Sequence, residues 1–112
     1  MKKALFSCLF SSLLFAQTPL DYLNTLRTQT GLNTLVENGN LTQAATNHTD
    51  YMRQNNIVGH YESSSNAGYT GVHPYDRAIY ANYQSRYVRE NVSAGQPSAQ
   101  ASIDGDTAPN SV

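Results

Sequence analysis

His60 and Glu62 are spaced so that they could do chemistry together. His60 follows Gly59 just beyond the end of a predicted helix, so its side chain projects from a loop, and Glu62 stands two residues further on. A loop imidazole beside a carboxylate can be held in one tautomer, act as a base near neutral pH or bind a divalent metal. A His-x-Glu pair is a weak pattern by itself, so a histidine without an active role remains the alternative.

Glu90 is the second residue whose setting indicates chemistry. It lies in a predicted strand over residues 87–92 and shares one face of that strand with two valines. A carboxylate buried on such a face must be ion-paired, hydrogen-bonded or metal-bound. Two interpretations stay open: Glu90 faces a functional cleft, or it forms a salt bridge to Arg77 or Arg86.

His48 lies on the apolar face of a predicted helix, where it could serve as a ligand. The favoured interpretation is a buried histidine whose ring nitrogens are satisfied by neighbouring carbonyls or hydroxyls. No Gly-x-Ser-x-Gly motif, Cys–His pairing, phosphate loop or cysteine-based metal site is present.

The first sixteen residues have the pattern of an export signal. Two lysines precede an apolar stretch from Ala4 to Phe15, and Ala16 suits the position before a cleavage site. The stretch is shorter than the roughly 20 residues of a membrane span, so we expect no stable span once the signal is removed. The sequence therefore predicts a secreted or periplasmic protein.

Removal of residues 1–16 changes the charge and the cysteine content. All the lysines and Cys8 leave with the signal, so five arginines remain against eight acidic residues. The absence of a basic face argues against nucleic acid as a partner. Without cysteine there can be no disulfide, so packing alone must stabilise the fold.

The elements that must position the candidate residues follow from periodicity and from helix-breaking residues. The expected order is a helix opened by Pro19 and ended by Gly31, a turn at residues 38–40, a helix from Leu41 to Asn55 and a loop over 59–75. A helix starting near Pro74, the strand 87–92, a helix starting at Ala99 and a disordered tail over 106–112 follow.

Several short motifs occur in an order that resembles a known family. They are Leu23–Asn24–x–x–Arg27, Gly31–Leu32, Leu35, Asn38, Leu41, Ala44–Ala45, His48, Met52, Asn55, His60, Gly68–Tyr69, Arg77–Ala78 and Glu90–Asn91–Val92–Ser93–Ala94–Gly95. In this order, from about Leu20 to Gly105, the chain resembles a bacterial secreted member of the CAP superfamily, the group of cysteine-rich secretory proteins, antigen 5 and pathogenesis-related proteins.

The resemblance implies an α-β-α sandwich and a cleft formed by two histidines and two glutamates, which can bind zinc or another divalent metal. By motif position, His60 is similar to the first cleft histidine and Glu90 to the first cleft glutamate, so both are candidate metal or ligand residues. Glu62 is a secondary candidate. The resemblance also implies a lipid, cell-envelope or protein ligand.

The chain departs from the family pattern after Gly105, because it has no histidine beyond His73 and only Asp104 and Asp106 as later acids. We therefore expect an α+β fold that is a C-terminally truncated sandwich, with a partial domain over residues 17–105, one or two strands and the final sheet strands missing. The expected function is a binding module rather than an enzyme. A non-functional truncated fragment and a metal-dependent hydrolase using His60 and Glu90 are the alternatives.

Overall fold

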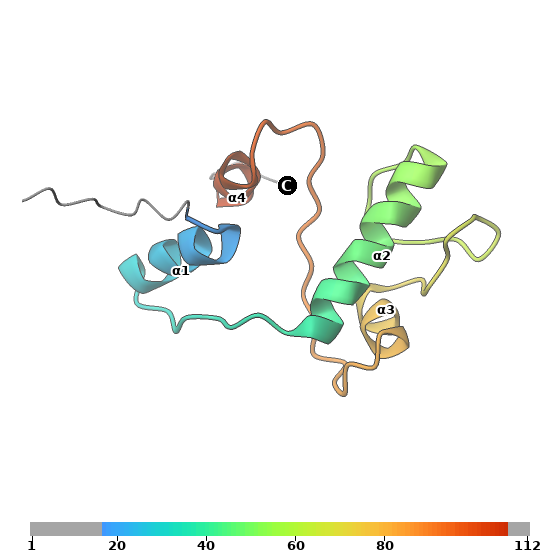
Figure 1. The fold of residues 1–112 in the computed structure, drawn as a ribbon, viewed down its shortest axis with the longest axis horizontal. Coiled ribbons are helices and arrows are strands. Elements are labelled where there is room, and N and C mark those ends of the chain that lie inside the picture. The colour runs from blue at the N-terminus through green and yellow to red at the C-terminus, as the bar shows by residue number, and fades with distance from the viewer. Residues whose placement is uncertain (1–16, 108–112) are drawn as a thin grey trace, which may run out of the picture.

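The computed structural model describes residues 17–107, which form four helices that pack as two pairs. The helices are α1 (Pro19–Gln29), α2 (Gly39–Asn55), α3 (Pro74–Tyr80) and α4 (Ala99–Thr107). Helix α1 packs with α4, and α2 packs with α3. Two long connecting segments, residues 30–38 and 81–98, join the pairs (Figure 1). The predicted signal, residues 1–16, lies outside the described residues. Helix α4 includes residues 106 and 107 of the predicted tail, and the rest of that tail is not described.

Local sequence signals explain where the first two helices begin and end. The Thr18 hydroxyl accepts a hydrogen bond from the Asp21 amide, and the Asp21 carboxylate accepts one from the Thr18 amide, which together form a capping box. Gly31 follows the end of α1 with φ of 78°, a left-handed conformation that glycine adopts without strain. The predicted turn at residues 38–40 is the start of α2, because the Asn38 side chain accepts hydrogen bonds from the Asn40 and Leu41 amides.

Helix α1 has no buried residue, and exposed polar contacts join it to the connecting segment and to α4. The Asn24 side chain bonds both the carbonyl and the amide of Leu35, and Arg27 Nε donates to the Asn33 carbonyl at 2.7 Å. These bonds fold the connecting segment back along α1. The Tyr22 hydroxyl donates to an Asp104 carboxylate oxygen at 2.5 Å, which links α1 to α4.

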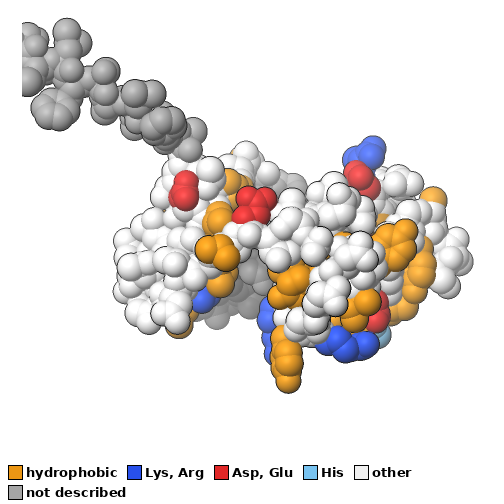
Figure 2. Space-filling view, turned by 60° about the horizontal axis from the view of Figure 1, so that its bottom comes forward, with side chains coloured by type: hydrophobic (Ala, Val, Ile, Leu, Met, Phe, Trp, Pro, Cys, Tyr) orange, Lys and Arg blue, Asp and Glu red, His pale blue; other side chains and the backbone are white. Residues whose placement is uncertain are grey.

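The core lies between α2, α3 and the loop that joins them. Its buried apolar residues are Ala44 and Tyr51 on α2, Ala78 on α3, and Ala81. The core also contains three buried polar side chains, those of His48, Glu62 and Arg77. Large apolar side chains remain exposed, and Figure 2 shows apolar side chains gathered on the surface of the α2–α3 pair. The core therefore combines a few apolar side chains with a buried polar cluster rather than forming a hydrophobic layer.

The predicted α+β sandwich is wrong for the described part of the chain, where every regular element is a helix. Residues 87–92, predicted as a strand, have no strand beside them, and their one backbone–backbone hydrogen bond joins the Val88 amide to the nearby Arg86 carbonyl. A strand exists only when its amides and carbonyls pair with another strand. The predicted alternation of side chains is nevertheless present, because Val88, Glu90 and Val92 are less exposed than their neighbours.

The Tyr22–Asp104 contact gives a first prediction. The hydrogen bond to Asp104, with smaller contributions from desolvation and the aspartate charge, raises the pKa of Tyr22 above its ordinary value of 10.0. We expect Tyr22 to ionise later than a free tyrosine and to shift back when Asp104→Asn removes the charge. Difference titration of tyrosinate absorbance between the parent and Tyr22→Phe measures this group alone. A Tyr22 that ionises at the ordinary pH in the parent would contradict the α1–α4 contact.

Candidate functional site

The Arg77 guanidinium lies at the centre of the polar cluster. Its Nη2 donates to both oxygens of Glu90, at 2.9 and 2.7 Å, and its Nε lies 3.8 Å from Glu62 Oε1. Its Nη1 donates to the carbonyls of Gly71 and Val72 at 3.3 and 3.1 Å. Arg77 is 1% exposed, so these partners replace water around the cation. One side chain thus joins α3, the 59–73 loop and the extended segment that carries Glu90.

Gly71 is required where Arg77 meets this loop. A Cβ at position 71 would lie 2.7 Å from the Cβ of Asp76 and 2.9 Å from the Arg77 amide nitrogen. Both distances are shorter than any non-bonded contact that such atoms tolerate. Glycine therefore lets the loop backbone approach the first turn of α3 closely enough for its carbonyl to accept from Arg77.

His48 and Glu62 form the inner half of the cluster. His48 Nδ1 lies 2.8 Å from Glu62 Oε1, and His48 Nε2 lies 2.7 Å from the Gly59 carbonyl oxygen. A carbonyl can only accept, so Nε2 donates, and the contact with Glu62 then needs a second proton between the ring and the carboxylate. The prediction that His48 is buried with both ring nitrogens satisfied is confirmed, with a carboxylate in place of a hydroxyl.

Further hydrogen bonds hold the loop onto α2. The second carboxylate oxygen of Glu62 accepts from the Thr70 amide at 2.7 Å. The Tyr51 hydroxyl accepts from the Ser63 amide at 2.8 Å and from the Asn66 side chain at 2.9 Å. Residues 62–70 therefore have a fixed path although they contain no regular secondary structure.

The structure brings His60 and Glu90 together. His60 Nδ1 lies 3.1 Å from Glu90 Oε1, although thirty residues separate them in the sequence. The Glu90 side chain is 18% exposed and that of His60 is 51% exposed, so the pair lies at the rim of the cluster. Glu90 also forms the predicted salt bridge to Arg77, while its place in a functional cleft stays a prediction. Glu62 pairs with His48 and leaves His60 to Glu90.

The donor set around His60 does not fit a catalytic zinc ion. Both oxygens of Glu90 accept from Arg77. The other nearby imidazole, His48, directs its Nε2 to the Gly59 carbonyl, and this nitrogen lies 4.0 Å from Glu90 Oε1. A catalytic zinc usually has three protein ligands. Within residues 17–107, no group of three or more histidine, cysteine or acidic side chains is placed to hold a metal ion.

A groove of about 340 Å³ lies beside Glu90, between α2, α3 and residues 87–91. Arg77 and Glu90 line it together with Arg89 and Asn91. The rest of its lining is formed by apolar and aromatic residues: Leu41, Ala44, Ala45, Pro74, Ala78, Tyr87 and Val88. The groove thus combines an apolar wall with a fixed ion pair, an arrangement that positions a ligand through a few polar groups.

A comparison with known families decides what this arrangement belongs to. The model of the cysteine-rich secretory protein family, CAP, matches residues 20–105. The chain belongs to the CAP family. No curated protein and no solved structure matches the chain. Among the residues that the structure describes in this CAP chain, no helix has both the length and the apolar composition needed to cross a bilayer.

Sequence reasoning on this CAP chain identified His60 and Glu90 but missed two features of the cluster. Proximity in the sequence pairs Glu62 with His60, whereas the partner of Glu62 is His48, on the helix that precedes the loop. Arg77 was considered only as a partner for Glu90, whereas it also bonds two loop carbonyls. The available signal was the Arg77–Ala78 pair within the family pattern.

A second polar group surrounds the start of α3. The Asp76 carboxylate accepts from the His73 amide at 3.1 Å and contacts the His73 ring nitrogen at 3.0 Å. The His73 ring stacks on the Tyr75 ring. The Arg86 guanidinium also lies over the Tyr75 ring, 4.4 Å from its centroid. Burial works to raise the pKa of Asp76, but the hydrogen bonds from His73, with the charges of His73 and Arg86, lower it below its ordinary value of 3.8.

Removal of the central cation tests the cluster. Arg77→Met keeps much of the side-chain volume but leaves two buried or partly buried carboxylates without their cation, so we expect a loss of about 3–5 kcal/mol in the free energy of unfolding. The matched control is Arg53→Met, because Arg53 is 74% exposed and pairs only with the exposed Asp50; we expect a change within about 0.5 kcal/mol. Urea denaturation measures both, and equal losses in the two variants would refute the central role of Arg77.

Acid should weaken the start of α3. A carboxyl whose pKa is lower in the folded state contributes stability above its unfolded pKa, and loses that contribution as pH falls through the folded pKa. Asp76→Asn should therefore lower the free energy of unfolding by about 0.5–1 kcal/mol at neutral pH, a modest figure because the side chain is 35% exposed and screened. The parent and the variant should converge well below pH 3.8. A difference that persists unchanged in acid would contradict this account.

Proposed function

We propose that this CAP-family chain is a binding module that holds the apolar part of a ligand in the groove between α2, α3 and residues 87–91. The observation that carries the proposal is the position of Glu90, which lines the groove, is fixed by Arg77 at 2.7 Å and contacts His60 at the rim. A pre-formed polar group beside an apolar wall is the usual composition of a ligand site.

His60 supplies the adaptable polar contact of this site. Its Nδ1 contacts Glu90, which orients the ring, and the side chain is half-exposed, so the ring edge remains accessible to a ligand. An oriented imidazole can donate or accept a hydrogen bond near neutral pH. It therefore suits a ligand that joins an apolar body to a hydroxyl, carbonyl or carboxylate group.

The contacts of Glu90 favour binding over hydrolysis. A general base must be able to take a proton from water or substrate. Both oxygens of Glu90 accept from Arg77 Nη2 and one also contacts His60, while Glu62 is engaged by His48 and Thr70. Binding at the groove needs neither carboxylate to leave its partners.

We also propose that the protein acts after export, in the periplasm or outside the cell. The support is the signal pattern in residues 1–16, together with membership of a family described as secretory. A lipid, a cell-envelope component and a protein segment all have the apolar groups that this groove can take.

Filling the groove tests the proposal. Ala45 is exposed on α2 and lines the groove, so Ala45→Trp should occupy the space without burying a new group in the core. Dansyl-labelled undecanoic acid serves as the apolar probe, and its fluorescence on titration with the full chain gives the affinity. We expect the variant to bind about tenfold more weakly, or worse, because it loses the contact area on one wall.

The control is Ala67→Trp, which adds the same side chain to an exposed loop position that does not line the groove. This variant should bind the probe as the parent does. Equal probe binding by all three proteins, or no binding by the parent, would show that the groove is not a binding site.

A further inference from the structure

A second hollow, of about 430 Å³, lies beside the turn that follows α3. We call it the turn pocket, and its lining comes from one short stretch of the chain: Ile79, Asn82, Tyr83, Gln84, Ser85 and Arg86. All of these residues except Ile79 carry a side-chain group that forms hydrogen bonds. Among the described residues, the turn pocket shares no lining residue with the groove beside Glu90, so the two are separate places on the surface.

Contacts within this stretch fix the shape of the turn pocket. The Asn82 amide donates to the Ile79 carbonyl at 2.9 Å. The Tyr83 amide donates to the Ala78 carbonyl, also at 2.9 Å. Asn82 has φ of 68°, a left-handed conformation in which asparagine is enriched, and its carbonyl accepts from the Gln84 side chain at 3.1 Å. The pocket is therefore formed by the chain itself before any ligand arrives.

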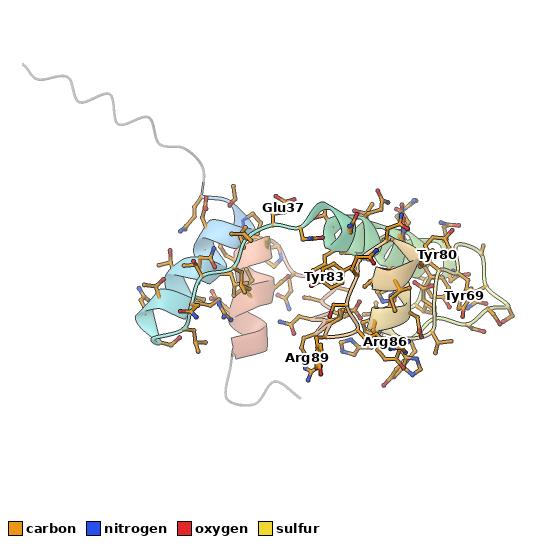
Figure 3. The ribbon with its side chains drawn as sticks, turned by 90° about the horizontal axis from the view of Figure 1, so that it is seen from below. Glu37, Tyr69, Tyr80, Tyr83, Arg86 and Arg89 are labelled. Carbon is orange, nitrogen blue, oxygen red and sulfur yellow. The ribbon has the colours of Figure 1, made fainter. Side chains whose placement is uncertain are left out.

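Arg86 is held in place although it is exposed. Its guanidinium lies over the Tyr75 ring, and its Nη2 lies 3.9 Å from Asp76 Oδ1. Figure 3 shows Arg86 at the end of α3 that is opposite to Tyr80. The Arg86 side chain is 67% exposed, so N–H groups of its planar guanidinium are accessible to a ligand. A donor that is already oriented loses less conformational entropy on binding than a free surface arginine.

The lining groups match a ligand that forms many hydrogen bonds. The side-chain amides of Asn82 and Gln84 each place a donor beside an acceptor, and hydroxyl groups can act as either. An apolar ligand would strip water from these groups without replacing its hydrogen bonds, which costs free energy. A sugar ring carries neighbouring hydroxyls that match the paired donor and acceptor of an amide. Its C–H face can lie on the apolar surface of Tyr83.

The charge of the protein favours an uncharged ligand. Residues 17–112 contain five arginines against eight acidic residues, so the field of the chain opposes the approach of a polyanion. Within the site, the Asp76 carboxylate offsets the charge of Arg86. The pocket therefore lacks the excess of positive charge that would select a sugar with carboxylate or sulfate groups.

We propose that the turn pocket binds an uncharged oligosaccharide. Asn82 and Gln84 form hydrogen bonds with pairs of ring hydroxyls, and Tyr83 contacts the face of a sugar ring. Arg86 donates to hydroxyl oxygens at the side of the pocket nearest Tyr75. This site does not depend on the ligand of the groove beside Glu90.

Isothermal titration of the full chain with cellotetraose tests the proposal, because the ring hydroxyls of this saccharide are equatorial and its ring faces are apolar. We expect Asn82→Gly to bind about fivefold more weakly or worse, since it loses an amide while glycine keeps the positive φ without strain. Gln84→Ala, at an exposed position, should weaken binding similarly.

The matched control is Asn56→Gly. Asn56 is also an exposed asparagine with positive φ, at 51°, but it follows α2 and does not line the turn pocket. This variant loses the same amide in the same backbone conformation and should bind cellotetraose as the parent does. Equal binding by the parent, Asn82→Gly and Gln84→Ala, or no binding by the parent at millimolar concentration, would refute the proposal.

Two further titrations distinguish the ligand class and the site. Tetragalacturonic acid, which carries a carboxyl group on every ring, should bind more weakly than cellotetraose, and tighter binding would overturn the uncharged class. Ala45→Trp fills the groove and should leave the affinity for cellotetraose unchanged. A loss of cellotetraose binding in that variant would assign the saccharide to the groove and overturn the turn pocket as its site.

Discussion

The structure depends on one buried cation. Arg77 contacts carboxylates from two separate parts of the chain and two loop carbonyls, so the 59–73 loop, α3 and the extended segment all converge on its guanidinium. A planar group with five donors can satisfy this many partners at once, which lysine cannot. The surrounding apolar core is small, consisting mainly of alanines and Tyr51. Polar complementarity therefore replaces much of the hydrophobic packing that usually fixes three segments in place.

Such a core specifies geometry more strongly than it adds stability. A buried ion pair recovers the desolvation of its charges only when every partner is in place. Here every buried side-chain nitrogen and oxygen of the described residues has a hydrogen-bond partner. The result is a fixed Glu90 at the wall of the groove and an oriented His60 at the rim of the cluster. The site is rigid because the cluster behind it tolerates few alternatives.

The extended segment after α3 shows how this rigidity reaches the surface. Glu90 fixes the segment against the helices, and Val88 and Val92 on either side of it are likewise less exposed than their neighbours. Its far end is linked to α4 through the Ser93 and Ser102 hydroxyls, 3.1 Å apart. The segment is therefore attached to α3 through Glu90 and to α4 through Ser93.

The sequence alone determined the local features. Breakers and capping residues placed α1, α2 and the starts of α3 and α4, because helix ends depend on residues within one turn. Alternation predicted which side chains of residues 87–92 face inward. The positions of His60 and Glu90 in the family pattern predicted that these two side chains lie close together. Only the tertiary structure decided that residues 87–92 form no sheet, that Glu62 pairs with His48 rather than its neighbour His60, and that Arg77 joins them. Strand pairing and buried ion pairs both require partners distant in the chain, and no local pattern encodes which distant group arrives.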